Sequence, residues 1–200
     1  MSVSASVRFF DQQFQRQLRE AELQLNPFEQ AALPWLRGQV LDFGCGLGNQ
    51  ALAAARRGCT VLALDGSATA IAHLRQRADA EGLVVDARQA ELADYRLPQD
   101  FDAIVCIGLL MFLDCEHALR QLAQLQARLR PGGVLVLNLL VQGTTYLDMF
   151  DPRQQCLLPA PQWRAPFAGW QIEQCTTQDL PAPQQRVKAF LTLIATKPPV

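Results

Sequence analysis

The chain has 200 residues, of which half are apolar and 18% are charged, and its formal net charge is −1. A chain of this length and composition can bury the core of one ordinary domain, and it is neither disordered nor fibrous. The near balance of 18 basic and 19 acidic residues argues against a broad nucleic-acid surface or an anionic-membrane binder, since both need a basic excess.

The chain carries no pattern of export, membrane insertion or metal binding. Its longest uncharged apolar run, residues 104–113, is about half of the twenty residues that span a membrane. Charged side chains interrupt the first twenty residues, so we expect no signal peptide and a cytoplasmic protein. The six cysteines form no CxxC pair, and with two histidines they give no zinc spacing. We expect Cys45, Cys59 and Cys106 to be small buried hydrophobic residues rather than metal ligands or disulfide partners.

Helices are expected before the first strand. Residues 7–25 have an amphipathic pattern with Phe9, Phe10 and Phe14. A second helix is expected to begin after Asn26, because Pro27 and Glu29 then stand where the first helical residue and a capping box place them.

Short aliphatic runs then alternate with helical stretches, which predicts βαβ units and a parallel sheet covered on both faces. The expected strands are 39–43, 60–64, 82–87, 101–107 and 134–141. The expected helices are 49–57, 68–80 with Ser67 as its cap, and 115–129 with Asp114 as its cap.

The C-terminal part differs from this alternation. Residues 142–167 hold four of the twelve prolines and little periodicity, which is typical of a functional loop or lid. Residues 170–176 and 187–196 read as two strands, and no helix separates them, so we expect antiparallel neighbours.

The strongest motif is the run DFGCGLG at residues 42–48, which follows a strand and opens a helix. Glycines let the backbone turn sharply and approach a ligand closely, and free N–H groups at the helix start favour a carboxylate or phosphate. The spacing is GxGxG rather than the GxGxxG of the dinucleotide fingerprint. Alone, it is also compatible with a tight strand-to-helix connection.

Two acidic residues follow later strands. Asp65 ends the second strand, where a carboxylate can accept hydrogen bonds from both hydroxyls of a ribose. A turn or capping role is the alternative, although Gly66 and Ser67 can perform both tasks. After the third strand, Glu91 can accept from the amino group of an adenine, a task for which Asp86 and Asp94 compete.

Taken in order, five segments resemble the class I S-adenosylmethionine-dependent methyltransferases. They are VLDFGCGLG (40–48), LALDG (62–66), QAEL (89–92), FDAIVCIGLLMFL (101–113) and LRPGGVLVL (129–137), and the resemblance extends over residues 36–197. It implies a Rossmann-like α/β three-layer sandwich whose seven-stranded, mostly parallel sheet has its last strand antiparallel. It also implies S-adenosyl-L-methionine as cofactor and S-adenosyl-L-homocysteine as product. The implied cofactor-binding residues are Asp42, Gly44, Cys45, Gly46, Asn49, Asp65, Gly66, Ser67, Ala90, Glu91, Leu92, Ile107, Leu110 and Met111.

A narrower resemblance concerns the tellurite-resistance methyltransferases, to which LMFL (110–113), GWQI (169–172) and LIATK (193–197) are similar. It implies methyl transfer to a small molecule such as a soft nucleophile or a chalcogen oxyanion like tellurite. This chain departs from that group where Pro181-Ala182 replaces a His-Arg pair and Ala189 an Arg, although Arg186 matches a basic position. The loss of positive groups weakens the case for an anionic substrate.

No single catalytic residue is predicted, because an activated sulfonium mainly needs an aligned nucleophile. We expect His73 and His117 to be structural. Residues expected to close the site or touch the substrate are Phe9, Phe10, Phe14, Tyr146, Met149, Phe150 and Arg186. Ordinary packing of the aromatic residues is an equal alternative.

Within one methyltransferase domain we expect a helical cap (1–37), a cofactor-binding core (38–141), a lid-like loop (142–167) and antiparallel strands (168–197). We expect no nucleic-acid or membrane partner, and a monomer or homodimer. Two other functions stay open: a nicotinamide-dependent oxidoreductase, against which the glycine spacing and the antiparallel tail count, and a non-catalytic binding or regulatory module of the same fold.

Overall fold

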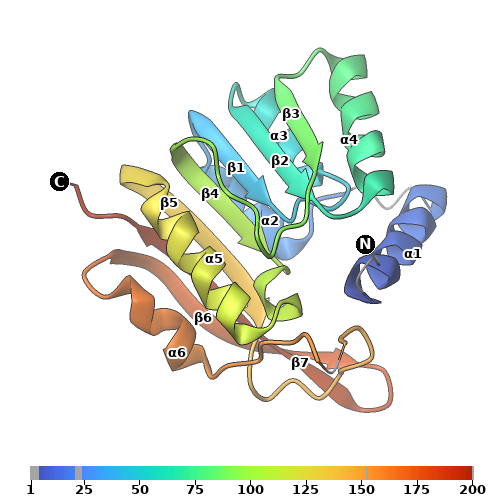
Figure 1. Cartoon of the computed structure of the whole chain (residues 1–200), viewed down its shortest axis with the longest axis vertical. Helices are drawn as coiled ribbons and strands as arrows, with labels where there is room; N and C mark the ends of the chain where they lie inside the picture. Colours follow the sequence, from blue (N-terminus) through green and yellow to red (C-terminus); the bar gives the residue numbers. More distant parts are fainter. Residues whose placement is uncertain (1–4, 21–23, 152, 200) are drawn as a thin grey trace.

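A seven-stranded sheet forms the centre of the molecule. The computed structural model describes residues 5–20, 24–151 and 153–199 (Figure 1). The strand order is β3-β2-β1-β4-β5-β7-β6, and β7 is antiparallel to both of its neighbours. This is the expected Rossmann-like arrangement. The strands are β1 (Gln39–Phe43), β2 (Thr60–Asp65), β3 (Val85–Gln89), β4 (Phe101–Ile107), β5 (Leu129–Leu140), β6 (Gln171–Ala182) and β7 (Arg186–Thr196).

Helices cover both faces of this sheet, while the first helix lies at the edge where the parallel strands end (Figure 1). The helices are α1 (Ala5–Glu20), α2 (Pro27–Ala32), α3 (Asn49–Arg56), α4 (Ala68–Glu81), α5 (Cys115–Ala127) and α6 (Ala160–Arg164). Three 3-10 turns complete the path: η1 (Leu33–Trp35), η2 (Leu110–Phe112) and η3 (Ala165–Phe167).

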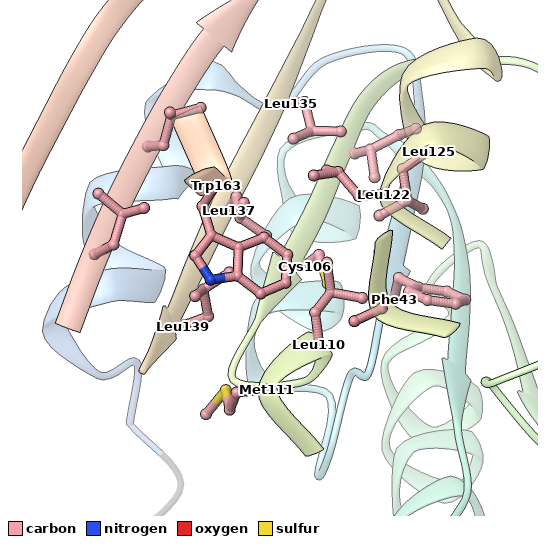
Figure 2. Close-up of a cluster of buried hydrophobic side chains, with 14 of the residues drawn as sticks. Phe43, Cys106, Leu110, Met111, Leu122, Leu125, Leu135, Leu137, Leu139 and Trp163 are labelled. Carbon is pink, nitrogen blue, oxygen red and sulfur yellow. The ribbon is translucent and has the colours of Figure 1, made fainter. Parts of the chain in front are cut away.

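Alternation along the strands divides the core into two layers. In β5, Val134 and Val136 face the layer that contains α3 and α4, whereas Leu135 and Leu137 face the layer of α5 and α6. Trp163 of α6 is fully buried in the second layer, among the leucines of β5 (Figure 2). Because strands buried on both faces need apolar residues at nearly every position, the part of β5 from Val134 onward is an apolar run interrupted at Asn138.

The predicted start of α2 is confirmed. The Asn26 side chain accepts from the N–H groups of Phe28 and Glu29, at 2.9 and 3.0 Å. Glu29 in turn accepts from the Asn26 N–H at 2.8 Å. This reciprocal cap fixes a helix of only six residues beside the edge where the parallel strands end. Of the amphipathic stretch 7–25, residues 7–20 lie in α1 and residues 21–23 lie outside the described residues.

The expected loop 142–167 is wrong in its second half, which forms α6 and η3. Pro161 and Pro166 occupy the first turns of α6 and η3, where the missing N–H costs nothing. Trp163 and Phe167, four residues apart, supply the buried helical face. The true loop is residues 141–159. The fifth strand also begins earlier than expected, at Leu129, because α5 already ends at Ala127.

Cys45, Cys59 and Cys106 are buried and free, as expected. A disulfide that the spacing did not suggest joins Cys115, the first residue of α5, to Cys156 in the loop 141–159. Throughout the described ranges, no helix is long and apolar enough to cross a membrane, and no group of three metal-ligating side chains is found.

Candidate active site

A cavity of about 1270 Å³ opens at the carboxyl ends of β1, β2, β4 and β5, between α1 and the loop 141–159. In open α/β sheets, ligands bind at this edge, where the strand order reverses. The reversal here lies between β1 and β4. The volume exceeds the roughly 300–1,000 Å³ that is usual for one ligand. The cavity therefore has room for two molecules side by side.

The glycine loop, residues 44–48, forms a wall of the cavity whose shape is set by the main-chain conformation. Gly44, Gly46 and Gly48 have positive φ of 86°, 51° and 76°, which L side chains rarely adopt. The N–H groups of Gly44 and Cys45 donate to the Leu64 carbonyl at 2.8 and 3.0 Å. A Cβ at Gly48 would lie 2.4 Å from the buried Leu74 side chain. The loop therefore requires glycine for its turn and for its close packing.

Hydrogen bonds to Asp65 connect this loop to the turn that follows β2. Its two carboxylate oxygens accept from the N–H groups of Gly46 at 2.9 Å and Ser67 at 2.8 Å. Burial raises the pKa of Asp65, and the same N–H bonds oppose this shift. Because each carboxylate oxygen can accept twice, the group still has capacity for two ligand hydroxyls.

The helix α1 lies directly over the glycine loop. A Cβ at Gly46 would meet the Phe14 ring at 3.2 Å, and the Ser67 hydroxyl donates to Asp11 of α1. Phe10 packs edge-on to Phe112 of η2, with ring centres 4.9 Å apart. The aromatic side chains of α1 therefore close one side of the cavity.

Three buried polar side chains in the cavity wall have atoms without a hydrogen-bond partner among the described residues. They are Asp42 (Oδ2), Gln50 (both amide atoms) and Asn138 (Oδ1), and each side chain is at most 4% exposed. Burial and the nearby Glu29 and Asp65 carboxylates raise the pKa of Asp42 to about 8. Because an unmatched buried polar group is costly, the cavity is built to receive a polar ligand.

The wall formed by α2, β7 and the loop 141–159 is aromatic and carries a cation. The Lys188 ammonium lies 4.8 Å from the centre of the Tyr146 ring. Phe190, two residues along β7, packs on Phe28 of α2 with ring centres 4.8 Å apart. All four side chains line the cavity.

The predicted cofactor-binding residues line this cavity, with one exception. Leu110 is completely buried in the core between the sheet and α5 (Figure 2). The reason is the tight turn η2, which directs Leu110 inward, whereas Leu109 and Met111 line the cavity.

The predicted closing residues Phe9, Phe10, Phe14, Tyr146 and Met149 also line the cavity, but two others do not. Phe150 stacks beneath Phe112 at 4.8 Å. Arg186 lies outside, where it forms two hydrogen bonds to Asp148 of 2.5 and 2.8 Å.

Of the two histidines, His73 on α4 does not line the cavity, whereas His117 does. The His117 ring Nδ1 contacts the Asp114 carboxylate at 2.7–2.9 Å. Its Nε2 lies 3.7 Å from Asp94. The ring is thus held at the rim beside the loop after β3.

Among the lining residues that sequence reasoning missed are Glu29, Gln50, Asn138, Lys188 and Phe190. Asn138 interrupts the apolar run VLVLNLL, which is a usable signal, since a buried amide needs partners. Lys188 and Phe190 share one face of β7 by simple alternation. Glu29 was already assigned as a capping residue, and its second role could not be read from that pattern.

Residues 40–133 match the family model described as a methyltransferase domain. Over 122 residues the chain is 34% identical to the ubiquinone biosynthesis O-methyltransferase of Actinobacillus pleuropneumoniae, covering 56% of this chain and 50% of the relative. Over 106 residues it is 34% identical to a carboxy-S-adenosyl-L-methionine synthase of Yersinia pestis, covering 50% of this chain and 39% of the relative. The chain thus spans half or less of the curated relatives it matches.

Among solved structures, TehB from Haemophilus influenzae superposes with a TM-score of 0.72 at 19% identity, covering 86% of this chain and 62% of that one. The likeness concerns the fold. The chain therefore has a Rossmann-like fold. Its segment from β1 to the start of β5 matches the methyltransferase domain model in sequence as well.

Proposed function

We propose that this protein is an S-adenosylmethionine-dependent methyltransferase that acts on a small-molecule acceptor. The observation that carries the proposal is the carboxylate-rich cavity beside the glycine loop. It is lined by Asp42, Asp65 and Glu29. Within the described part of the chain, none of these three is ion-paired with an arginine or lysine.

This charge pattern fits a cationic cofactor and disfavours a nicotinamide dinucleotide. S-adenosylmethionine carries a sulfonium and an ammonium, and both are attracted by carboxylates. A pyrophosphate at the same loop would be repelled by Asp42 whenever that group is deprotonated. The pKa of Asp42, raised to about 8 by burial and by Glu29 and Asp65, falls when a cation binds beside it.

Particular residues would hold each part of the cofactor. Asp65 would accept from the ribose hydroxyls, and Asp42 with Gln50 would satisfy the ammonium and carboxylate of the methionine end. The segment 90–92 would surround the adenine. When bound, the cofactor supplies a methyl group on a positively charged sulfur, which leaves as the neutral thioether of S-adenosylhomocysteine.

The chain's own contribution is orientation and exclusion of water. The rigid glycine loop fixes one reactant, and the aromatic wall at Phe190 positions the other. Phe14, which lies over Gly46, keeps solvent from the reacting end.

The narrower resemblance adds soft nucleophiles and chalcogen oxyanions such as tellurite as candidate acceptors. Lys188 in the cavity wall supports an anionic acceptor. The replacement of the expected His-Arg pair by Pro181-Ala182 counts against a multiply charged oxyanion.

Calorimetric titration with S-adenosylhomocysteine and, separately, NADH tests the proposal. We expect micromolar binding of the former alone. In Asp65→Ala the affinity should fall roughly 100-fold, because two hydrogen bonds to a charged group are lost. Asp86→Ala is the matched control, since Asp86 is an exposed carboxylate paired with Arg88 on β3.

Binding of NADH would overturn the proposal in favour of an oxidoreductase. Binding of S-adenosylhomocysteine without turnover of S-adenosylmethionine across an acceptor screen would favour a non-catalytic module. Tellurite, selenite, thiols, phenols and aromatic acids belong in that screen.

A further inference from the structure

A column of side chains runs from the floor of the cavity to its rim along two antiparallel strands. In the register of β5 and β7, Asn138 pairs with Thr192 and Leu140 with Phe190. Side chains two residues apart share a face, so Thr192, Phe190 and Lys188 follow one another along β7. From Thr192 to Lys188 the column is about 13 Å long, at roughly 3.3 Å per residue.

A buried amide forms the floor of this column. The Asn138 Nδ2 donates to Thr192 Oγ1 at 2.9 Å and to the Leu191 carbonyl at 3.3 Å. Its Oδ1 has no partner within the described residues, and the side chain is only 1% exposed. The Asn138 backbone carbonyl accepts from the Gly108 N–H at 2.8 Å. The floor therefore lies beside the end of β4 and offers a hydrogen-bond acceptor.

The Lys188 ammonium, which is available to pair with a ligand, lies at the rim of the column. Lys188 and Arg186 both lie against the Tyr146 ring, at 4.8 and 4.7 Å from its centre. Arg186 is neutralised by Asp148. In the described ranges Lys188 has no carboxylate within ion-pair distance, and it lines the cavity.

Two aromatic side chains, Phe190 and Tyr146, lie between the floor and the rim of this column. Phe190 is held in place by Phe28 of α2, with ring centres 4.8 Å apart. Tyr146 stands next to Lys188 across the mouth. A flat apolar body fits between such rings, since aromatic pairs gain from stacked and edge contacts. A small oxyanion such as tellurite is far shorter than this column of about 13 Å.

Resting on the proposed function, we propose that the methyl acceptor is an aromatic carboxylic acid that lies along this column. Its carboxylate pairs with Lys188 at the rim, and its ring packs on Phe190 and Tyr146. Its hydroxyl or amino group donates to Asn138 Oδ1 at the floor. The end that is methylated is thereby placed beside β4, next to Ile107 and Met111 of the cofactor wall. Its oxygen or nitrogen forms the bond to the methyl carbon as the carbon–sulfur bond breaks, and sulfur keeps the electron pair as the neutral thioether. The proton of the methylated group passes to water in the open cavity, and Asn138 Oδ1 only orients that group.

The test is calorimetric titration of the S-adenosylhomocysteine-saturated protein with 4-hydroxycinnamate and with its methyl ester. The ester should bind at least about 10-fold more weakly, because it cannot form a charge-assisted bond to Lys188. Lys188→Met keeps the apolar stem and should remove this preference. Arg57→Met, which deletes an exposed cation outside the cavity, is the matched control.

A second variant tests the floor. Asn138→Leu should lose affinity for 4-hydroxycinnamate but not for cinnamate, which lacks the hydroxyl donor. S-adenosylhomocysteine affinity, measured first on every variant, reports whether the cofactor wall is intact.

Equal binding of acid and ester, an unchanged preference in Lys188→Met, or no acid binding to the loaded protein would each overturn the proposed acceptor class. The last of these leaves the proposed function standing. If S-adenosylhomocysteine itself does not bind, the proposed function fails and this inference fails with it.

Discussion

The two walls of the cavity are built by different means. The wall at β1 and β2 is made by backbone: its glycines turn with positive φ, and Asp65 receives main-chain N–H groups of the loop. The wall at β5 and β7 is made by side chains, among them Asn138, Phe190 and Lys188. A cofactor common to many enzymes can be held by main chain, whereas an individual acceptor must be recognised by replaceable side chains. We therefore expect substitutions on the two walls to have separable effects.

The largest expected effect concerns the disulfide that joins the loop 141–159 to the start of α5. Cys115 and Cys156 are 41 residues apart, and closing a loop of that length stabilises a protein by about 4 kcal/mol in the chain-entropy model. The double variant Cys115→Ser, Cys156→Ser should lose about this much unfolding free energy in urea titrations. Acceptor turnover should fall, with S-adenosylhomocysteine affinity kept within about twofold.

Cys175→Ser is the control, since Cys175 is a free, exposed cysteine on β6. A parallel loss of cofactor affinity in the double variant would show that the two walls are not separable.

On the backbone wall, Gly48→Ala should cost about 2–4 kcal/mol of unfolding free energy. The left-handed backbone is strained for alanine, and its Cβ would lie 2.4 Å from the side chain of Leu74. Gly82→Ala has a similar φ of 62° and nothing within 4 Å, so it should cost only about 1 kcal/mol. Equal losses in denaturant titrations would mean that the contact with Leu74 is irrelevant.

The Asp42 carboxyl makes the backbone wall pH-dependent. Its pKa is raised from 3.8 to about 8 by burial, so between these values the folded protein binds a proton that the unfolded chain releases. The contribution to stability is therefore present at low pH and is lost as pH rises towards 8. The unfolding free energy of the wild type, relative to Asp42→Asn, should fall from pH 5 to pH 8.

Asp86→Asn provides the comparison for this pH series, because Asp86 is exposed. A difference between wild type and Asp42→Asn that stays constant over the same range would contradict a raised pKa.

The smallest effect is expected from Arg186→Gln. Arg186 forms a surface pair with Asp148 and does not line the cavity, and such pairs contribute little. Affinities for S-adenosylhomocysteine and for 4-hydroxycinnamate should both change less than about twofold. A larger loss of acid binding than in Lys188→Met would show that the wrong cation of β7 had been assigned to the acceptor.

Local patterns explain what could be predicted. The alternation of strands and helices, the glycine loop and the cap at Asn26 each depend on residues close together in the chain. Leu110 was misplaced because a single 3-10 turn decides which of three consecutive apolar residues faces inward.

Long-range geometry explains the misses. The side that Lys188 and Arg186 face depends on the register of β7 and on the pairing of Arg186 with Asp148. The partner of Cys115 depends on the path of the loop 141–159, which contains no periodicity from which its course can be read.

The antiparallel direction of β7 has a consequence for how acceptor preference can change. Because the strand enters at the rim and runs inward, each step of two residues moves about 6.6 Å deeper along one wall. Lys188, Phe190 and Thr192 thus lie at successive depths along the proposed acceptor column. Moving the positive charge from position 188 to 190 would select a shorter acceptor, and none of the cofactor-wall residues would have to change. If the acceptor lies along this column as proposed, cofactor binding and acceptor length depend on different residues and can be varied separately by substitution.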